Sequence, residues 1–364
     1  MIIHVRGTNT RNKGAQLMLE AIHSRIGDKF ELSVVPATID RDVRTRLDLR
    51  QNLCLPGLPQ LAATVGNLAS ANFKSKHLLT SDRDIDGVLD ASGFHYTDQL
   101  PMAFSRTEAV AGRAWARRGI PKILMPQAFG PFERRLTRKW STEALEQARL
   151  VFVRDRVSEK YVRELGVGTT IVRSPDFTIG LKPPTIDPVA AQPFFAIVPN
   201  NKMFTHGGLK RDDYVNLLSR YSAAAAEQGL ATVIIVHEST DHDVAKQLAD
   251  QIGAPIFIDP DPLVLKAALG QATAAIASRF HAVVGCLSQS IPTAALGWSH
   301  KYHELLHDFA VPDRVITPET DPRAVVTTLL TDDAGNRRQQ DQLPELLVKV
   351  DAMWAQIFDT LIGG

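Results

Sequence analysis

Short apolar runs alternate along the chain with longer segments in which apolar residues recur every three or four positions. The short runs predict β-strands, and the longer segments predict amphipathic helices. The strand-like runs are residues 2–5, 30–35, 87–91, 122–125 and 150–153, then 194–198, 232–236, 256–258, 273–277 and 293–296. Helical segments between them include 13–26, 141–147, 158–165, 211–228 and 243–252. This alternation is typical of α/β proteins, in which helices cover both faces of a parallel sheet.

A proline-rich stretch near the middle of the chain separates two such series. Residues 182–188 include three prolines, and the strand–helix pattern restarts after them. We therefore expect two doubly wound, Rossmann-like domains that face a cleft, over residues 1–182 and 189–340. A last helical segment, 344–361, follows the second series. Residues 341–364 are expected to form a C-terminal helix that could pack back across the domain junction.

Composition and charge narrow the class of protein. The chain has 364 residues, of which 44% are hydrophobic and 22% charged, as in an ordinary globular protein with a full core. Its net charge of +1 gives no reason to expect nucleic acid as a partner. The two cysteines, Cys54 and Cys286, are too few for a disulfide framework or a zinc cluster. Cys286 lies in an apolar helical segment, which favours a buried thiol.

The pattern of hydrophobic residues predicts a cytoplasmic protein. The start of the chain lacks the apolar central region of a signal peptide. No stretch reaches the roughly 18 uninterrupted apolar residues that span a bilayer. Segment 53–73 is apolar and loop-like. A packed surface segment is the preferred interpretation, and a peripheral contact with the inner face of a membrane is left open.

The segment Ser278-Arg279-Phe280-His281 is the most informative feature of the sequence. It joins a strand-like run to an apolar helical segment, and ligands of α/β proteins bind where strands end and helices begin. An arginine there suits a carboxylate or a phosphate, because its planar fork donates two parallel hydrogen bonds. A histidine two residues later can move protons near neutral pH. This turn therefore combines anion binding with acid–base chemistry.

Other strand ends carry further candidate side chains. Residues 7–16 form a glycine-containing turn that opens a helix, where Asn12 is either an anion-site residue or a helix cap. Arg154 is a second anion ligand expected to face Arg279 across the cleft, or half of a surface ion pair, with Asp155 after it as a helix cap. Asp176 is a base, an orienting partner or a cap. The remaining candidates are Ser92, His95, Gln127 and Lys301, with the polar strand ends 199–202 and 237–241 expected at the same edge.

Several familiar catalytic motifs are absent from the sequence. It contains no metal-ligand spacing, no G-x-S-x-G nucleophile elbow and no Walker loop. We therefore expect metal-free chemistry without a cofactor, built on arginine, histidine and a carboxylate.

Taken together, these segments resemble the polysaccharide pyruvyl transferase family over about residues 1–310. The matching pieces, in order, are Asn12-Lys13-Gly14-Ala15, Ser92-Gly93, 127–131, Arg154-Asp155 with Ser158 and Gly166, and 278–281 with Pro292 and Lys301. The Ser-Arg-x-His piece is the most specific of them. The sequence departs from the common pattern at Ser92, where glycine is usual, and at 200–202, where many members have an arginine; these departures leave the acceptor open.

The resemblance implies a two-domain fold like that of the GT-B glycosyltransferases. It implies phosphoenolpyruvate as the donor and a saccharide, free or lipid-linked, as the acceptor of a pyruvate ketal. It assigns donor binding to Arg279 and Arg154 and catalysis to His281, with Asp176 orienting His281 or acting as a second base. We also expect substrate binding by five further residues, namely Asn12, Ser92, His95, Gln127 and Lys301.

Two other functions are consistent with the same pattern. One is a GT-B-type glycosyltransferase that uses a nucleotide-sugar donor, since a fold alone does not determine function. The other is a non-catalytic saccharide-binding protein. These alternatives predict different ligands: a nucleotide diphosphate for the first, and a saccharide without turnover for the second.

Overall fold

The computed structural model describes residues 1–52, 70–205, 207–297 and 299–363, which form two compact units. Unit 1 comprises Met1–Thr10, Met18–Phe177 and Val350–Gly364, and unit 2 comprises Arg11–Leu17 and Thr178–Lys349. The chain therefore passes from unit 1 to unit 2 just before the proline-rich stretch 182–188. Cys54 and most of segment 53–73 lie outside the described residues, so the expected peripheral membrane contact remains a prediction.

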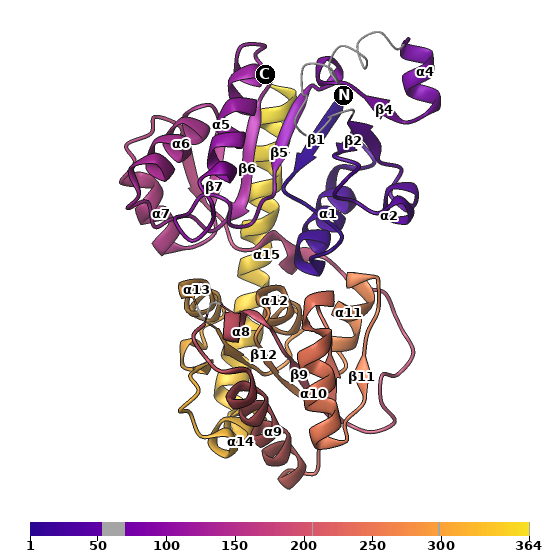
Figure 1. Cartoon of the computed structure of the whole chain (residues 1–364), viewed down its shortest axis with the longest axis vertical. Coiled ribbons are helices and arrows are strands. Elements are labelled where there is room, and N and C mark those ends of the chain that lie inside the picture. The colour runs from indigo at the N-terminus through magenta and orange to yellow at the C-terminus, as the bar shows by residue number, and fades with distance from the viewer. Residues whose placement is uncertain (53–69, 206, 298, 364) are drawn as a thin grey trace. The chain divides into compact units, whose positions relative to one another are not determined.

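The described part of unit 1 contains an eight-stranded parallel sheet, seen with its helices in Figure 1. Its strands in chain order are β1 (Ile2–Arg6), β2 (Glu31–Val34), β3 (Arg50–Asn52), β4 (Leu79–Thr80), β5 (Gly87–Asp90), β6 (Lys122–Gln127), β7 (Leu150–Val153) and β8 (Thr170–Arg173). Their order in the sheet is β4-β3-β2-β1-β5-β6-β7-β8. Strands β5, β6 and β7 are buried along their whole length, as expected of strands covered on both faces.

Helices connect these strands in the βα order that the sequence predicts. They are α1 (Lys13–Ile26), α2 (Arg41–Arg46), α4 (Ala71–Lys76), α5 (Ala103–Ala116), α6 (Arg135–Glu146) and α7 (Arg156–Arg163). The predicted helix start at Asp155 is confirmed, because the Asp155 carboxylate accepts a hydrogen bond from the backbone N–H of Ser158. Along the chain, α-helices follow the carboxyl ends of β1, β2, β5, β6 and β7.

Unit 2 repeats this architecture with a six-stranded parallel sheet. The strands are β9 (Phe194–Val198), β10 (Ala231–Ile235), β11 (Ile256–Phe257), β12 (Ala274–Ala277), β13 (Thr293–Leu296) and β14 (Val315–Ile316), arranged as β11-β10-β9-β12-β13-β14. The helices are α8 (Lys202–Thr205), α9 (Arg211–Glu227), α10 (His242–Ile252), α11 (Pro262–Leu269), α12 (Phe280–Leu287), α13 (His300–Asp308) and α14 (Pro322–Thr331). The two predicted doubly wound sheets are confirmed.

The two faces of the unit 2 sheet have separate hydrophobic cores. Along β9, Phe194 and Ala196 belong to a core built with α11, α12 and α13, whereas Phe195 and Ile197 belong to a core built with α9, α10 and α14. This division follows from the two-residue period of a strand, which points successive side chains to opposite faces. Cys286 of α12 is fully buried in the first core, and burial raises the pKa of its thiol to about 12. The predicted buried thiol is confirmed.

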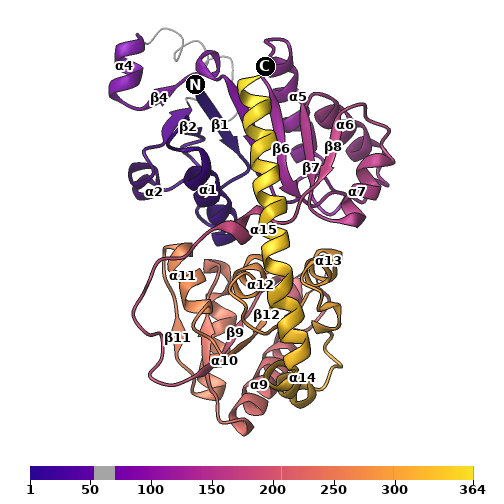
Figure 2. The same cartoon turned by 180° about the vertical axis from the view of Figure 1, so that it is seen from behind.

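The C-terminal helix α15 (Asp333–Ile362) is longer than predicted. Its start lies well before residue 344, and Pro344 stands inside the helix, where the missing N–H costs about 3 kcal/mol. Packing offsets this cost, because Leu346 belongs to a unit 2 core and Trp354 contacts Phe177 of unit 1 edge-on at 6.0 Å. Figure 2 shows the C-terminal part of α15, in yellow, lying across the unit 1 sheet.

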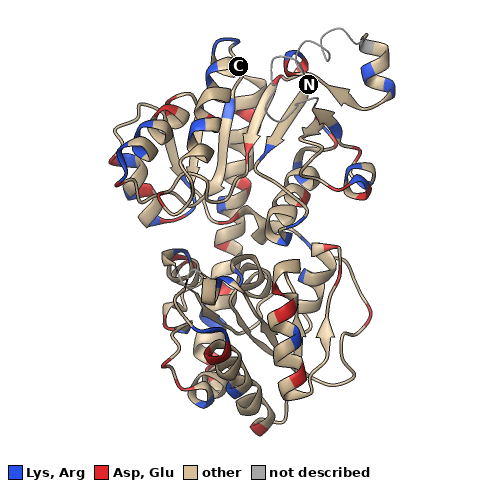
Figure 3. Cartoon of the chain, in the orientation of Figure 1, with Lys and Arg blue, Asp and Glu red and all other residues tan. Residues whose placement is uncertain are grey.

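Charged residues are distributed over the elements of both units. Figure 3 shows Lys and Arg as well as Asp and Glu on elements of both units, in keeping with the net charge of +1. No helix among the described residues is long and apolar enough to cross a membrane.

Replacing Trp354 with alanine is expected to lower the free energy of unfolding by about 3–5 kcal/mol, because the side chain is only 2% exposed and no other group can fill its place. Urea unfolding followed by circular dichroism measures this change. Val348→Ala on the same helix is the control; Val348 is 68% exposed, so its loss should stay within about 0.5 kcal/mol. Equal effects of the two changes would contradict the packing role of Trp354.

Candidate active site

The turn between β12 and α12 places the predicted catalytic segment at the carboxyl end of the unit 2 sheet. Arg279 is the residue before the helix, in an extended conformation, and Phe280 and His281 form the first turn of α12. Ser278 is fully buried beneath them. This arrangement is the strand-to-helix position that the sequence predicts for a ligand site.

Three hydrogen bonds hold the carbonyl and side chain of Ser278, and a fourth holds the Tyr214 hydroxyl that binds it. Its carbonyl oxygen accepts from Nδ2 of Asn200 at 2.7 Å and from the Tyr302 hydroxyl at 2.8 Å. The Tyr214 hydroxyl donates to Oγ of Ser278 at 2.8 Å and accepts from the backbone N–H of Asn200 at 3.0 Å. All four residues are buried, so these bonds are shielded from water. The turn is therefore fixed from β9, α9 and α13 together.

The guanidinium of Arg279 is surrounded by carboxylates. Its Nε and Nη2 donate to the two oxygens of Asp241 at 2.7 and 2.5 Å, and its Nη1 donates to Glu238. Burial would lower the pKa of Arg279, but the hydrogen bonds and charge of Asp241, with the charge of Glu238, outweigh it and raise the pKa above the ordinary value. Two negative charges thus face one positive charge. In this conformation Asp241 binds both donors on the Nε side of the guanidinium, Nε and Nη2.

The first turn of α1 belongs to unit 2 and lies beside Glu238 and His281. The side-chain oxygen of Asn12 accepts hydrogen bonds from the backbone N–H groups of Gly14 at 2.9 Å and Ala15 at 3.2 Å, so the predicted cap is confirmed. Nζ of Lys13 donates to the carbonyl of Pro260 at 2.5 Å. Asn12 also forms an antiparallel backbone bridge with Glu238. The helix start is thereby tied to the loop after β10.

Two neighbours define the surroundings of the His281 imidazole. A side-chain carbon added to Gly14 would lie 2.1 Å from Nδ1 of His281, so the ring rests directly on the glycine backbone. The Phe280 ring meets the imidazole edge-on at 5.4 Å. Nζ of Lys301 lies 5.6 Å from the centre of the Phe280 ring. Lys301 and His281 thus share Phe280 as a neighbour.

His237 is a buried imidazole at the end of β10, next to Glu238. It is 2% exposed, and its Nε2 has no hydrogen-bond partner among the described residues. Burial lowers the pKa of His237 to about 3, with further lowering by the charges of His281, Arg279 and Lys13. His237 is therefore neutral at physiological pH, in a cluster of cationic neighbours.

In unit 1, the predicted residues follow four adjacent strands. Ser92 and His95 come after β5, Gln127 ends β6, Arg154 follows β7, and Asp176 follows β8. Because neighbouring strands lie about 4.8 Å apart and all point the same way, these side chains gather at one edge of the sheet. The group is a second candidate cluster and lies within unit 1 alone.

Asp90 organises the first of these strand ends. Its carboxylate accepts hydrogen bonds from the backbone N–H of Ser92 at 3.1 Å, from the Ser92 hydroxyl and from the Tyr96 hydroxyl at 2.5 Å. Gly7, at φ +79°, approaches so closely that an added side-chain carbon would lie 2.3 Å from Cα of Ser92. Asp90 and Gly7 together hold the turn that carries Ser92.

Gln127 and His95 each have one side-chain atom near that turn that makes no hydrogen bond within the described structure. Nε2 of Gln127 donates to the carbonyl of Asp90 at 3.4 Å, while its Oε1 is buried without a partner in the described structure. The His95 ring packs on Phe104 at 4.9 Å, and its Nδ1 is likewise buried without a described partner. The Gln127 oxygen can accept a hydrogen bond from a hydroxyl group, and the His95 nitrogen can accept or donate one according to its tautomer.

Arg154 and Asp176 form a buried ion pair, with Nη1 and Oδ2 3.2 Å apart. Their side chains are 6% and 1% exposed, so the surface ion pair considered for Arg154 is wrong: the partner is buried in the same strand-end cluster. The backbone N–H of Arg154 donates to the carbonyl of Gln127 at 3.0 Å. Asp176 thus orients an arginine, one of the roles expected for it.

A buried charge network lies behind the Asp90 turn. Glu108 binds Arg6 through two nitrogens, at 3.2 Å to Nε and 2.7 Å to Nη2, and Nζ of Lys122 lies 3.8 Å from both Asp90 and Glu108. Burial would raise the pKa of Glu108, but the charges of Arg6 and Lys122 lower it to about 2. The network keeps the Glu108 carboxylate ionised beneath the strand ends.

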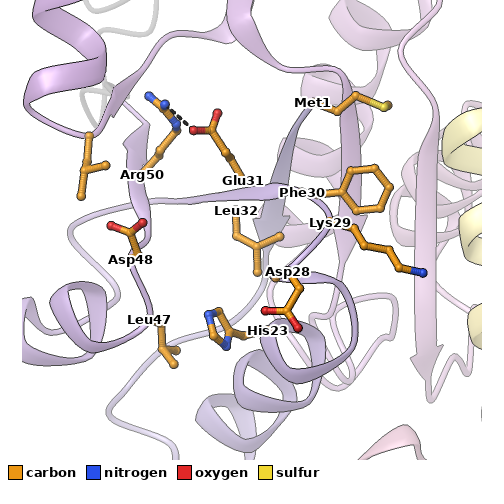
Figure 4. Close-up of a pocket in the computed structure, with 12 residues that line it drawn as sticks. Met1, His23, Asp28, Lys29, Phe30, Glu31, Leu32, Leu47, Asp48 and Arg50 are labelled. Carbon is orange, nitrogen blue, oxygen red and sulfur yellow. Dashed lines mark hydrogen bonds and ion pairs between the residues drawn. The ribbon is translucent and has the colours of Figure 1, made fainter.

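A separate pocket of about 260 Å³ lies in unit 1, at the amino-terminal ends of the strands. Figure 4 shows Met1, Glu31 and Arg50 at its rim, with Arg50 and Glu31 paired at 2.6 Å. Ligands of parallel sheets bind at the carboxyl ends of the strands instead. We therefore place the candidate site at those ends rather than in this pocket.

The structure collects the predicted residues into two groups. Unit 2 brings together Asn12, Arg279, His281 and Lys301, and unit 1 brings together Ser92, His95, Gln127, Arg154 and Asp176. The sequence did not indicate that Asp241 and Glu238 would bind Arg279, although both follow a strand run, β10, which β9 separates from β12 in the sheet. It also did not indicate the contact between Gly14 and His281, for which the only signal was a glycine in the first turn of a helix.

Lowering the pH below about 6.5 is expected to destabilise the protein through His237. Its folded pKa is about 3, so between pH 6.5 and 3 the unfolded chain binds a proton that the folded chain does not. The free energy of unfolding then falls by up to about 1.4 kcal/mol per pH unit. Urea unfolding between pH 7.5 and 5 should show a smaller slope for His237→Gln.

His4→Gln is the matched control for this measurement. Burial lowers the pKa of His4 to about 3 as well, but His4 lies in unit 1. Each substitution should remove its own share of the slope, and the shares should add. An unchanged slope in His237→Gln would contradict a neutral, buried His237.

Comparison with known proteins identifies the fold. A UDP-GlcNAc 2-epimerase from Neisseria meningitidis, solved with UDP-GlcNAc, superposes with a TM-score of 0.62 at 11% identity, over 100% of both chains. A glycosyltransferase from Rickettsia africae gives 0.58 at 9% identity, over 99% of this chain and 98% of that one. Anabaena HepE in complex with UDP-glucose gives 0.59 at 13% identity, over 100% and 99%. The predicted GT-B-like fold is confirmed.

Sequence comparison identifies the family. No curated protein matches the chain. The family model described as polysaccharide pyruvyl transferase matches residues 12–300 of the 364, a range that begins at the Asn12 cap and reaches α13. The chain belongs to the polysaccharide pyruvyl transferase family.

Proposed function

We propose that this protein transfers pyruvate from phosphoenolpyruvate to a saccharide, as a ketal across two hydroxyl groups. The observation that carries the proposal is the family match, which includes the whole Ser278-Arg279-Phe280-His281 turn. The turn supplies an imidazole at a strand end, beside cations and a helix N-terminus. This chemistry suits a small substrate with a carboxylate and a phosphate.

The proposed reaction needs proton transfers at carbon and at oxygen. Protonation of C3 of phosphoenolpyruvate makes C2 electrophilic, and the first acceptor hydroxyl forms a bond to C2 and loses its proton. The bond between C2 and the phosphate oxygen then breaks, and the electron pair leaves with the phosphate. The second hydroxyl bonds to C2 and loses its proton, which completes the ketal. One proton therefore moves to C3 and one leaves with the phosphate.

We assign the proton transfers to His281 and the anion contacts to the arginines and to Lys301. A positioned acid–base group contributes about 10²–10⁴-fold in rate. Arg154, oriented by Asp176, would bind one anionic group of the donor, and Arg279 would bind another when Glu238 gives way. Lys301 would add a third positive charge near Phe280.

The acceptor would contact the polar strand ends. Ser92, His95 and Gln127 offer hydrogen-bonding atoms of the kind that recognise sugar hydroxyls, and Asn12 would contribute through the helix start that it caps. A lipid-linked oligosaccharide handled at the inner face of a membrane is the acceptor form that we propose. No cofactor enters this scheme.

The first test compares thermal unfolding with phosphoenolpyruvate, with UDP and with neither. Phosphoenolpyruvate at about 100 times its dissociation constant should stabilise the protein by about 2.7 kcal/mol, and UDP should not. Incubation with phosphoenolpyruvate and a mixed saccharide pool should then give pyruvylated product, detected by mass spectrometry. In His281→Ala the stabilisation should persist while product formation falls at least about 100-fold.

Other results would select the alternatives. Stabilisation by UDP alone would indicate a nucleotide-sugar glycosyltransferase, a class favoured by the UDP-sugars bound in two of the structural neighbours. Saccharide binding that is unchanged in His281→Ala, with no turnover, would indicate a binding protein.

Replacing Glu238 with glutamine tests the donor-binding role of Arg279. Glu238 is 14% exposed at its side chain and contacts Nη1, whereas the Asp241 side chain is fully buried. Removing the competing charge should lower the dissociation constant for phosphoenolpyruvate about fivefold, equivalent to roughly 1 kcal/mol. Isothermal titration calorimetry measures this constant. Weaker binding would show that Arg279 supports the fold and does not bind the donor.

A further inference from the structure

Gly14 occupies an unusual place for a glycine, inside the first turn of a long helix. Its φ lies outside the left-handed region, so its backbone conformation does not require glycine. Glycine in a helix costs about 1 kcal/mol relative to alanine. The reason for glycine here must therefore lie in what approaches it.

The His281 imidazole is what approaches Gly14. A side-chain carbon at Gly14 would lie 2.1 Å from Nδ1, 2.7 Å from Cγ and 2.9 Å from Cε1 of His281. Distances below 3.0 Å are repulsive for any such carbon, and three ring atoms fall in this range. The imidazole therefore fills the volume that a side chain at Gly14 would need.

The neighbouring groups restrict how far the His281 imidazole can move. The α1 turn is held by the Asn12 cap, by Lys13 bound to Pro260, and by the backbone bridge between Asn12 and Glu238. The Phe280 ring stands edge-on to the imidazole, at an interplanar angle of 86°. Phe280 in turn packs against Tyr302 at 5.9 Å, and the Tyr302 hydroxyl is bound to Ser278. A side chain at Gly14 would have to rotate the imidazole away.

We propose that Gly14 is a positioning residue for His281: the bare first turn of α1 is the surface against which the imidazole is oriented for proton transfer. The inference rests on the proposed function, in which His281 moves the protons. It gives the Asn12-Lys13-Gly14 segment a role in the chemistry, distinct from a strand-to-helix connection. A displacement of about 1 Å in a catalytic group can lower a rate by about 10²-fold.

The first experiment compares Gly14→Ala with Gly168→Ala. A side-chain carbon at Gly168 meets nothing within 4 Å, so this change should leave the rate unchanged. Gly14→Ala should lower kcat for pyruvyl transfer about 100-fold, while KM for phosphoenolpyruvate changes less than threefold. Its circular dichroism spectrum should match that of the wild type. A wild-type kcat in Gly14→Ala would overturn the proposal.

A double substitution separates positioning from a general loss of structure. If Gly14 acts through His281, Gly14→Ala combined with His281→Ala should be no slower than His281→Ala alone. If the two effects multiply instead, Gly14 acts by another route and the proposal is wrong. Non-additivity is the result expected of residues that work as a unit.

A readout that needs no turnover keeps this inference separate from the proposed function. In nitrogen NMR spectra of the histidine-labelled protein, the His281 ring signals are assigned by their loss in His281→Ala. They should shift in Gly14→Ala and stay in place in Gly168→Ala. Unshifted signals would overturn the positioning role. Shifted signals in a protein without pyruvyl transfer activity would support the positioning role and refute the proposed reaction.

Discussion

The buried guanidinium of Arg279 is the interaction on which the unit 2 site depends. It joins the end of β12 to the loop after β10 through Asp241 and Glu238, and Asp241 also accepts the backbone N–H of Asn201 after β9 at 2.9 Å. A charge this deeply buried is stable only with partners of opposite charge and good geometry. The same loop forms the backbone bridge to Asn12. One ion cluster therefore sets where the turn of residues 278–281 and the start of α1 meet.

Unit 1 follows the same physical rule with different residues. Arg154 is held by Asp176, and Lys122 lies between the carboxylates of Asp90 and Glu108. These charges lie beneath the strand ends and leave short polar groups above them, such as Ser92 and Gln127. Rigid support of this kind keeps binding groups in place before a ligand arrives, which reduces the entropy lost on binding. Each unit thus builds its own strand-end cluster on buried ion pairs.

The sequence predicted the architecture well because buried parallel strands have a strong local signature. The apolar runs that became β5, β6, β9 and β12 needed no tertiary information. The short strands β3, β4 and β14 were missed, since two or three residues cannot display a period; the equally short β11 was predicted only because it lies in an apolar run. The start of α15 was missed because Pro344 reads locally as a helix boundary, whereas packing on both sides of it sustains the helix.

Strand-end positions also indicated the candidate residues, but not their partners. Arg279 and Arg154 could be selected because each ends a strand run. Their binding to Asp241 and Asp176 depends on the order of the strands in the folded sheet, which no local sequence pattern encodes. The contact between Gly14 and His281 joins residues far apart in the chain. Contacts of this kind can be predicted only when the topology of the fold is known.

The discontinuous make-up of the two units has a consequence for protein engineering. Residues Arg11–Leu17 belong to unit 2, and Val350–Gly364 belong to unit 1, although each is joined in sequence to the other unit. A chimera that exchanges one contiguous half of the chain for that of a relative would give His281 a foreign helix start. Acceptor specificity could be transplanted cleanly only with crossover points that keep Arg11–Leu17 together with the β10 loop and the α12 turn. The smallest exchangeable piece of this enzyme is therefore defined by its contacts and cannot be cut out at a single linker.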